Sequence, residues 1–229
     1  MPDYRLPWPD LSWWNDEGFN AYLKRFGERD GMNADRRWML YQLTGLVQSV
    51  PGDTAECGVF QGMGSYLICC SLPDRTHFIF DSFEGLSQPL PVDGDYWSEN
   101  TLACDLETVK KNLRECRNVS FHQGWIPDRF VDVESRRFCF VHIDVDLYQP
   151  TADSVQFFYP RMNDGGIIVC DDYGFSTCPG ATLAVDEFLS DKPEKMIALS
   201  CGSAFLIKGL AIQGLRFQDV ADTKKVAAL

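Results

Sequence analysis

Hydrophobic and polar positions follow two different patterns along the chain, and the change comes at about Ser49. Before that point, apolar residues recur at helical spacing over residues 19–26 and 33–50. Asn33 or Asp35 stands at the start of the second run and is its expected N-cap. After that point, short apolar runs bounded by Gly, Pro and Asp alternate with longer amphipathic stretches. The chain is therefore expected to begin with helices and to continue as strands alternating with helices.

Five strands and two short terminal strands are predicted in the second part. They are expected at residues 54–60, 76–81, 118–124, 137–144, 165–172, 196–201 and 203–209. Helices are expected at residues 64–72, 101–116, 151–159 and 181–191. Such alternation is typical of an α/β fold in which helices cover both faces of a mostly parallel sheet. Right-handed crossovers make that sheet doubly wound.

The chain contains no repeat and no linker, so we expect one globular domain overall. Residues 1–50 are predicted to form a helical arm that packs on the core, and residues 51–229 the main domain. The arm is rich in tryptophan, with Trp8, Trp13 and Trp14 close together. Residues 87–100, SQPLPVDGDYWSEN, form a long segment of Pro, Gly and acids, which is typical of a lid. A plain surface loop beside a packing arm is the equally weighted alternative.

Composition narrows the function classes. The 229 residues are 45% hydrophobic and 24% charged, and no run approaches 18 apolar residues, so a membrane span is not expected. The first residues have neither a basic nor an apolar signal region, which favours a cytoplasmic protein. Nine scattered cysteines without a CxxC pair favour buried, reduced thiols. A net charge of −12 argues against nucleic acid and is compatible with a small-molecule partner or a bound metal.

The first candidate site is the glycine-rich turn after the first predicted strand. Residues 56–65 read ECGVFQGMGS and lead into a predicted helix. Glycines let the backbone approach a ligand closely, and the helix N-terminus offers unpaired N–H groups. The spacing is not the GxGxxG of dinucleotide-binding proteins, which weakens a pyrophosphate interpretation. A turn needed only for tight packing is the alternative.

The second candidate is Asp81, which ends the second predicted strand in FDSFEG and is followed by Ser82. In doubly wound sheets, ligands bind outside the carboxyl ends of the strands. An acidic residue at this position is placed to accept hydrogen bonds from ribose hydroxyls. Together with the glycine-rich turn, it indicates a nucleoside-containing ligand.

The third candidate is a set of carboxylates after the fourth and fifth strands. Asp144 follows FVHI, and Asp171 and Asp172 follow IIVC. If those strands are neighbours, their axes lie about 4.8 Å apart and the carboxylates converge. So much negative charge in one place indicates a cation, and an all-oxygen site suits Mg²⁺, with Mn²⁺ or Ca²⁺ as alternatives. The other interpretation is that Asp144 caps a helix and Asp172 faces water.

Other polar residues near these strands are given structural roles. Asp146 is expected to point away from Asp144 and to cap the helix that follows. His142 lies inside a strand, so a buried, hydrogen-bonded core histidine is the favoured interpretation. His77 and His122 are likewise expected to be structural.

Several stretches in order resemble one family. AECGVFQGMGS, FDSFEGL, KKNL followed by FHQGW, FVHIDVDLYQPT, and GGIIVCDDYGF followed by PGATLAVDEF are similar to the macrocin O-methyltransferase family. The resemblance extends from about Met32 to Phe188. It implies a seven-stranded class I methyltransferase (Rossmann-like) sheet with an antiparallel last strand. It also implies S-adenosylmethionine-dependent, Mg²⁺-dependent methylation of a sugar hydroxyl on a natural product.

The resemblance also assigns roles to residues. It places the methionine part of the cofactor against Glu56, Gly58, Gly62 and Ser65. It implies that the ribose lies at Asp81 with Ser82 beside it, and the adenine at Gly124 and Trp125. Asp144, Asp171 and Asp172 correspond to the magnesium ligands, and Asp144 also to a cofactor contact and the catalytic base. Met63 stands where the family has a second adjacent glycine, so the shape of that loop is left open.

Three other functions are weighed against this one. A metal-dependent glycosyltransferase would use the DVD sequence to hold the metal of a nucleotide sugar, but it leaves Asp81 without a role. A nicotinamide-dependent dehydrogenase explains neither the glycine spacing nor the three carboxylates. A non-catalytic cofactor-binding protein is the non-enzyme alternative. The acceptor hydroxyl and the oligomeric state are not predicted, although the aromatic arm is compatible with a homo-oligomer.

Overall fold

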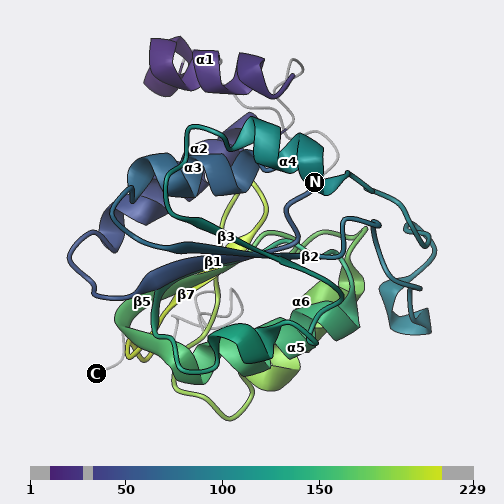
Figure 1. Ribbon diagram of the computed structural model, residues 1–229. Coiled ribbons are helices and arrows are strands. Elements are labelled where there is room, and N and C mark those ends of the chain that lie inside the picture. Colours follow the sequence, from purple (N-terminus) through teal and green to yellow (C-terminus); the bar gives the residue numbers. More distant parts are fainter. Residues whose placement is uncertain (1–10, 28–32, 213–229) are drawn as a thin grey trace, which may run out of the picture.

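A seven-stranded sheet runs through the centre of the protein (Figure 1). The computed structural model describes residues 11–27 and 33–212. The strands are β1 (Asp53–Cys57), β2 (His77–Asp81), β3 (Val119–Gln123), β4 (Phe138–Ile143), β5 (Met162–Cys170), β6 (Ile197–Ala198) and β7 (Ala204–Ile207). Their order in the sheet is β3-β2-β1-β4-β5-β7-β6, and β7 is antiparallel to both of its neighbours. The predicted mostly parallel, doubly wound sheet with an antiparallel last strand is confirmed.

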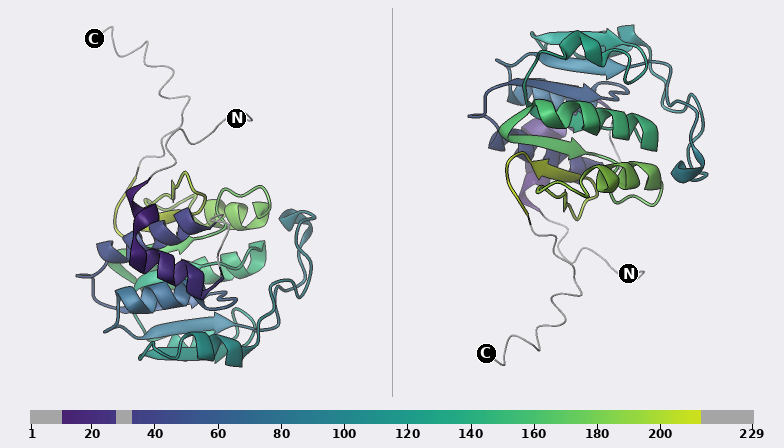
Figure 2. Two further views of the ribbon diagram at one scale, coloured as in Figure 1. Left: turned by 90° about the horizontal axis from the view of Figure 1, so that it is seen from above. Right: turned by 90° about the horizontal axis from the view of Figure 1, so that it is seen from below.

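Helices cover both faces of the sheet. They are α1 (Glu17–Arg25), α2 (Ala34–Leu46), α3 (Met63–Ser71), α4 (Leu106–Asn112), α5 (Tyr148–Phe158) and α6 (Pro179–Phe188). Figure 2 shows α2 and α3 on one face, with α1 outside them, and α5 and α6 on the other. Strand β4 is buried along its whole length, and its side chains, apolar except for His142, pack toward the helices on both faces.

Each face has its own hydrophobic core. Under α5 and α6, aromatic side chains such as Phe80, Phe138 and Phe158 pack edge-to-face in a fully buried cluster. On the other face, Phe140 and Ile167 of the sheet meet apolar residues of α1, α2 and α3. Successive side chains of a strand point to opposite faces of the sheet, so each central strand contributes to both cores.

The helical arm packs on the core through aromatic rings. Trp13 stacks on Trp38 of α2 with ring centroids 5.6 Å apart, and Phe19 of α1 meets both rings edge-on. Tyr22 donates a hydrogen bond to the carbonyl of Met63 at the start of α3. The tryptophan-rich sequence therefore serves packing between the arm and the α2–α3 layer. Trp8 lies outside the described residues.

Several predicted elements differ in length from the observed ones, and two of the differences have a clear local cause. The helix expected at residues 101–116 is shorter, because the Asp105 side chain caps α4 by accepting a hydrogen bond from the Thr108 N–H. Strand β5 begins at Met162, earlier than predicted, because Gly165 adopts a φ of 83° and lets the strand continue through an irregular register with β4.

Candidate active site

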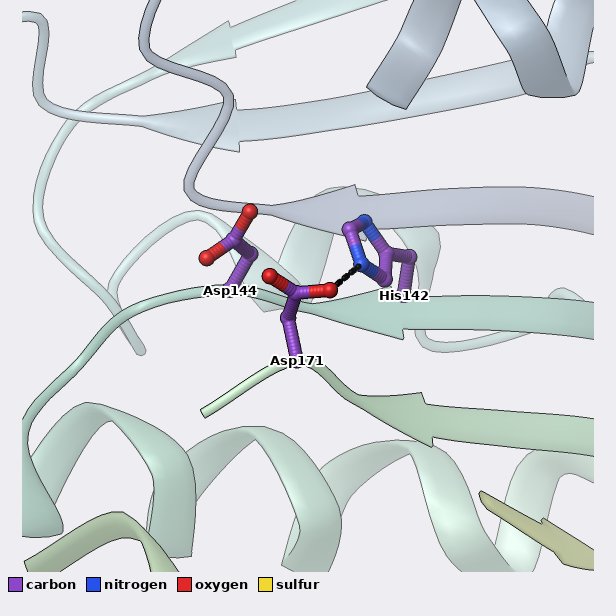
Figure 3. Close-up of side chains that lie close together, drawn as sticks. All are labelled: His142, Asp144 and Asp171. Carbon is purple, nitrogen blue, oxygen red and sulfur yellow. Dashed lines mark hydrogen bonds and ion pairs between the residues drawn. The ribbon is translucent and has the colours of Figure 1, made fainter. Parts of the chain in front are cut away.

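Asp144 and Asp171 stand side by side at the carboxyl edge of the sheet. In the register, Cys57 of β1 pairs with Ile143 of β4, and Ile143 pairs with Cys170 of β5. Asp144 is the residue after β4 and Asp171 is the residue after β5, so the parallel alignment places both carboxylates at the same level of the sheet. Figure 3 shows them facing one common space beside His142, and their ligand atoms lie within 4.8 Å of one another. This part of the predicted convergence is observed.

His142 connects this pair to the interior. Its Nδ1 lies 2.7 Å from Glu56 Oε1, and its Nε2 lies 3.3 Å from Asp171 Oδ1. All three residues are buried. Burial alone would lower the pKa of His142, but hydrogen bonds with Asp171 and Glu56 raise it to about 10. His142 is therefore an imidazolium between two carboxylates, in agreement with a buried, hydrogen-bonded histidine.

Two arginines from the first turns of α2 complete the charge balance. Arg36 Nη1 donates to Asp171 Oδ2 at 2.5 Å, and Arg36 Nη2 donates to Asn33 Oδ1. Arg37 Nη1 lies 3.8 Å from Asp144 Oδ2 and 4.0 Å from Asp171 Oδ1. Burial would raise the pKa of Asp171, but Arg37, His142 and Arg36 together hold it well below its usual range. Asp171 is thus ionised and already surrounded by cations.

Asp172 belongs to a second, adjacent cluster with Asp146 and Cys178. Its Oδ2 accepts the backbone N–H groups of Val145 and Asp146 at 3.1 and 2.8 Å. Burial first, and then Asp146 and Asp144, raise the pKa of Asp172 well above its usual value. Burial and Asp144 also raise the pKa of Asp146, to about 7. The three carboxylates predicted to share one site are therefore divided between two neighbouring clusters.

The predicted helix-capping role of Asp146 is wrong. The N-cap position of α5 is Leu147, and no side chain of its own turn caps the helix. Asp146 has a φ of 58° and turns its carboxylate inward, 3.6 Å from Cys178 Sγ. Its place is taken by Asp93 of the distant segment 87–100, whose Oδ1 accepts the Tyr148 N–H at 2.6 Å. The cap comes from elsewhere in the chain, which local spacing could not reveal.

A single cavity of about 580 Å³ connects these groups. Asp81 and Trp125 line one end, near β2 and β3, and Asp144 and Asp171 line the other. Further lining residues are Asn33, Arg36, Arg37, Gly58, Val59, Phe60, Ser82, Leu86, Trp97, Ile126, Asp146, Leu147 and Asp172. The cavity lies outside the carboxyl ends of the strands, where a doubly wound sheet places its ligands.

Asp81 is held rigidly at its end of the cavity. Its Oδ2 accepts the N–H of Val59 and its Oδ1 that of Phe83, both at 2.7 Å. Burial outweighs these hydrogen bonds and raises its pKa. The Phe60 N–H also approaches this carboxylate, and the acceptor capacity that remains is compatible with the predicted ribose contact.

The predicted cofactor residues fall into two groups. Gly58, Asp81, Ser82, Trp125 and Asp144 line the cavity. Glu56, Gly62, Ser65 and Gly124 are not among its lining residues. Glu56 and Ser65 hydrogen-bond each other in the interior and are 1% and 0% exposed. Their hydrogen bond links β1 to α3 on either side of the turn.

Two glycines of the turn are required for close packing. A Cβ on Gly58 would lie 1.9 Å from the carbonyl oxygen of Asp144, so only glycine lets β1 and β4 approach here. A Cβ on Gly64 would lie 2.1 Å from Glu56 Oε1, which makes that glycine a packing residue. Both positions support the tight-packing interpretation, and close approach of a ligand to Gly58, which lines the cavity, stays a prediction.

Sequence reasoning missed Arg36, Arg37, Asp93 and Trp97. The two arginines had a detectable signal, because cations in the first turns of a helix oppose the helix dipole and so call for a separate reason. Asp93 and Trp97 lie in the segment recognised as a lid candidate. Trp97 lines the cavity and donates its indole N–H to Cys178 Sγ at 3.3 Å, which fixes the segment to the start of α6.

Comparison with known proteins agrees with the fold. A family model described as macrocin O-methyltransferase (TylF) matches residues 40–198. A tetracenomycin 4′-O-methyltransferase acting on a rhamnosyl derivative, from Streptomyces olivaceus, is 31% identical over 156 residues, 60% of this chain and 59% of that protein. Demethyldecarbamoylnovobiocin O-methyltransferase from Streptomyces niveus is 31% identical over 157 residues, 61% of this chain and 59% of that protein. The alignments thus span about three-fifths of the relatives' length.

Solved methyltransferase structures align with this chain. The O-methyltransferase NovP aligns with a TM-score of 0.64 and 27% identity over 76% of this chain and 80% of its own. The calicheamicin methyltransferase CalS11 aligns with a TM-score of 0.66 at 18% identity, over 88% of this chain and 95% of its own, and supports the fold. Sheet order and edge site define a class I methyltransferase fold. Within that class, the chain belongs to the macrocin O-methyltransferase family.

No helix among residues 11–27 and 33–212 has the length and hydropathy to cross a membrane.

Proposed function

We propose that this protein transfers the methyl group of S-adenosylmethionine to a hydroxyl of a small molecule, a sugar carried by a natural product, in a metal-dependent reaction. The observation that carries the proposal is the cavity that joins Asp81 to the carboxylates after β4 and β5. At one end, the Asp81 carboxylate can accept hydrogen bonds from the ribose of a nucleoside. At the other end, the carboxylates after β4 and β5 can accept hydrogen bonds from a hydroxylated substrate. Donor and acceptor would therefore meet over the end of β4.

A divalent cation fits the charge of the acceptor end. Asp146 and Asp172 are buried, and no basic side chain among the described residues hydrogen-bonds to either. Their raised pKa values, due first to burial and then to neighbouring carboxylates, mean that these groups tend to be protonated without a cation and that a bound cation would favour their ionised form.

Oxygen ligands suit Mg²⁺, and Mn²⁺ or Ca²⁺ could replace it. Asp144, Asp171 and Asp172 would hold the ion, which when bound favours ionisation of a nearby alcohol. Within the described ranges, Asp144 and Asp172 have no hydrogen-bonded basic side chain, whereas Asp171 would have to exchange one of its present donors, Arg36, His142 or Ser203, for the ion.

The chain's own residues would orient the donor and move the proton. Asp81 accepts the ribose hydroxyls, and the turn at Gly58 lets the methionine portion approach the edge of the sheet. The Asp144 carboxylate, 26% exposed, accepts the proton of the substrate hydroxyl. Without a metal, burial and Asp171 raise the pKa of Asp144 to about 6, and a bound cation would lower it, so Asp144 would be ionised at neutral pH. Alignment of the nucleophile with the methyl group supplies a further part of the rate.

Asp146 is a second candidate for the base. It lines the same cavity, and its pKa of about 7 lies near neutral pH. Asp144→Asn and Asp146→Asn, assayed separately, assign the step. The variant of the true base is expected to lose at least about 100-fold in kcat while S-adenosylhomocysteine affinity stays within about twofold. If Asp144→Asn keeps near-normal turnover, the base is not Asp144.

The acceptor end supports a sugar substrate. Trp97 lines the cavity next to Cys178 of the Asp146–Asp172 cluster, and the acidic groups there can accept hydrogen bonds from neighbouring hydroxyls. The relatives' names include a rhamnosyl-tetracenomycin methyltransferase, and we extend that class of acceptor to this protein as a proposal. Residues 1–50 would serve as an arm that closes this end, because Asn33, Arg36 and Arg37 line it.

Two measurements test the proposal. Isothermal titration is expected to detect S-adenosylhomocysteine and no nucleoside diphosphate, whereas a glycosyltransferase would give the reverse. Methyl transfer from labelled S-adenosylmethionine to a rhamnosylated acceptor is expected to fall on chelator treatment and to return with Mg²⁺. Full activity after chelation would contradict the metal dependence. Cofactor binding without transfer to any of a panel of glycosides would favour a non-catalytic binding protein.

A further inference from the structure

We propose that the Arg37 guanidinium binds the carboxylate of the cofactor's amino-acid portion. This inference deepens the proposed function and rests on it. The resemblance-based assignment left that carboxylate to the glycine-rich turn, where Glu56 and Ser65 are buried and hydrogen-bonded to each other. Another group must then receive the charged end of the methionine.

Arg37 has hydrogen-bonding capacity that the protein does not use. Its Nε and Nη1 are buried, and neither has a hydrogen-bond partner. The two nearby carboxylate oxygens, of Asp144 and Asp171, lie 3.8 and 4.0 Å from Nη1, beyond hydrogen-bonding distance. Buried guanidinium groups are normally fully paired, so an acceptor from a ligand is expected here.

Arg36 differs from Arg37 in being fully engaged. It donates to Asp171 and to Asn33, and its guanidinium lies over the Phe175 ring at 4.9 Å. Asp171 also receives Ser203 and His142, so it does not need a further donor. Hydrogen bonding at Asp171 therefore explains Arg36, whereas Arg37 has ion-pair contacts with Asp144 and Asp171 but no hydrogen-bond partner at its Nε or Nη1.

The position of Arg37 suits an amino-acid carboxylate. Arg36 and Arg37 are the basic side chains that line the cavity in the described part of the chain. Asp81 ends β2, and two strand spacings, across β1, separate β2 from β4, where Arg37 approaches Asp144. That separation is about 10 Å, which matches the span from a ribose to the far end of an extended methionine chain. A planar guanidinium is also the side chain best suited to a carboxylate.

The test compares two ligands that differ in the amino-acid portion. S-adenosylhomocysteine carries the carboxylate, and 5′-methylthioadenosine retains the adenosine and sulfur without it. Titration calorimetry in chelator would give the affinity of both for wild type, Arg37→Gln and Arg37→Lys. Arg37→Gln is expected to bind S-adenosylhomocysteine about 10–100-fold more weakly and 5′-methylthioadenosine within about twofold of wild type. Arg37→Lys, which keeps the charge, should recover part of the loss.

Arg25→Gln is the matched control. Arg25 lies on α1, pairs with exposed Glu115 and does not line the cavity, so both affinities should stay at wild-type values. If Arg37→Gln weakens both ligands equally, or neither, the proposal is overturned and Arg37 serves only as a counter-ion for Asp144. If wild type binds neither ligand, the proposed function itself fails, and that outcome is distinct.

Discussion

At the scale of single residues, the site depends on an alternation of charge. Glu56, His142, Asp171 and Arg36 follow one another as anion, cation, anion and cation, and the first three are 3% exposed or less. Each group would be costly alone in the interior, but each has a partner of opposite charge. Removal of one partner is therefore expected to lower the free energy of unfolding by more than the intact ion pair contributes to it, because the other charge stays buried and unpaired.

His142 is the member whose loss would be most damaging. His142→Leu removes the cation between Glu56 and Asp171 and leaves both carboxylates short of a partner. We expect its free energy of unfolding to fall by about 3–5 kcal/mol, measured by urea denaturation at pH 7. His122→Leu is the control, because His122 pairs with partly exposed Asp132 at the sheet edge and should cost about 1 kcal/mol or less. Equal losses in the two variants would contradict the central role of His142.

At the scale of elements, segment 87–100 is fixed to the starts of α5 and α6. Asp93 is 2% exposed and accepts the N–H groups of Leu90 and Tyr148. A Cβ on Gly180 would lie 1.9 Å from Asp93 Oδ1, so α6 begins directly against the same carboxylate. A negative charge between two helix N-termini is favourable to both helix dipoles. Figure 2 shows this segment beyond the end of the sheet to which the parallel strands point.

Asp93→Ala should therefore loosen the segment as well as destabilise the fold. The free energy of unfolding is expected to fall by about 1–2 kcal/mol, in the range measured for lost N-caps. Limited proteolysis should cut within residues 87–100 faster than in wild type. Asp95→Ala, at an exposed position of the same segment, should change neither readout. Unchanged proteolysis in Asp93→Ala would show that other contacts, such as Trp97 with Cys178, are sufficient to hold it.

The C-terminal strands are held by one buried carboxylate, and its effect depends on pH. Glu194, 1% exposed, accepts hydrogen bonds from Tyr159, Lys208 and the Gly209 N–H. Burial would raise its pKa, but these donors lower it to about 2 from an ordinary 4.5. A lowered folded-state pKa gives stability that is complete above pH 4.5 and is lost as the pH falls toward 2.

Glu194→Gln should show this dependence as a difference from wild type. At pH 7 we expect the variant to be less stable by up to about 3 kcal/mol, and by progressively less as the pH falls below 4.5. Urea denaturation of both proteins between pH 3 and 7 measures the difference. A gap that stays constant over that range would mean that the carboxylate charge contributes nothing.

At the scale of the whole molecule, the sheet was predictable and the arrangement of charges around it was only partly so. Strand and helix periods are local signals, and a parallel sheet brings successive strand ends to one edge, so Asp81, Asp144 and Asp171 could be placed from sequence. The hydrogen-bond partners around the site could not be placed from sequence. Arg36 is 135 residues from Asp171, and Asp93 is 55 residues from Tyr148. Asp146 was assigned to a local cap for the same reason.

The excess of carboxylates at that edge leads to a prediction about global stability. An ion that binds the folded state alone stabilises it, and Mg²⁺ at 100 times its dissociation constant would add about 2.7 kcal/mol. For a chain of this size, that corresponds to a rise in Tm of about 5–10 °C, measured by calorimetry against chelated protein at matched ionic strength. Matched ionic strength matters because a net charge of −12 responds to any salt.

Asp172→Asn separates specific binding from that general response. Because one oxygen of Asp172 accepts both backbone N–H groups, the asparagine carbonyl can keep them while the negative charge is removed. The variant without metal should then be at least as stable as wild type, since repulsion from Asp146 and Asp144 is relieved, and its response to Mg²⁺ should be lost. Asp74→Asn, exposed at the opposite end of the sheet, should keep the full rise in Tm. If Asp172→Asn keeps it as well, the cation acts on overall charge, and the proposed metal ligands are wrong.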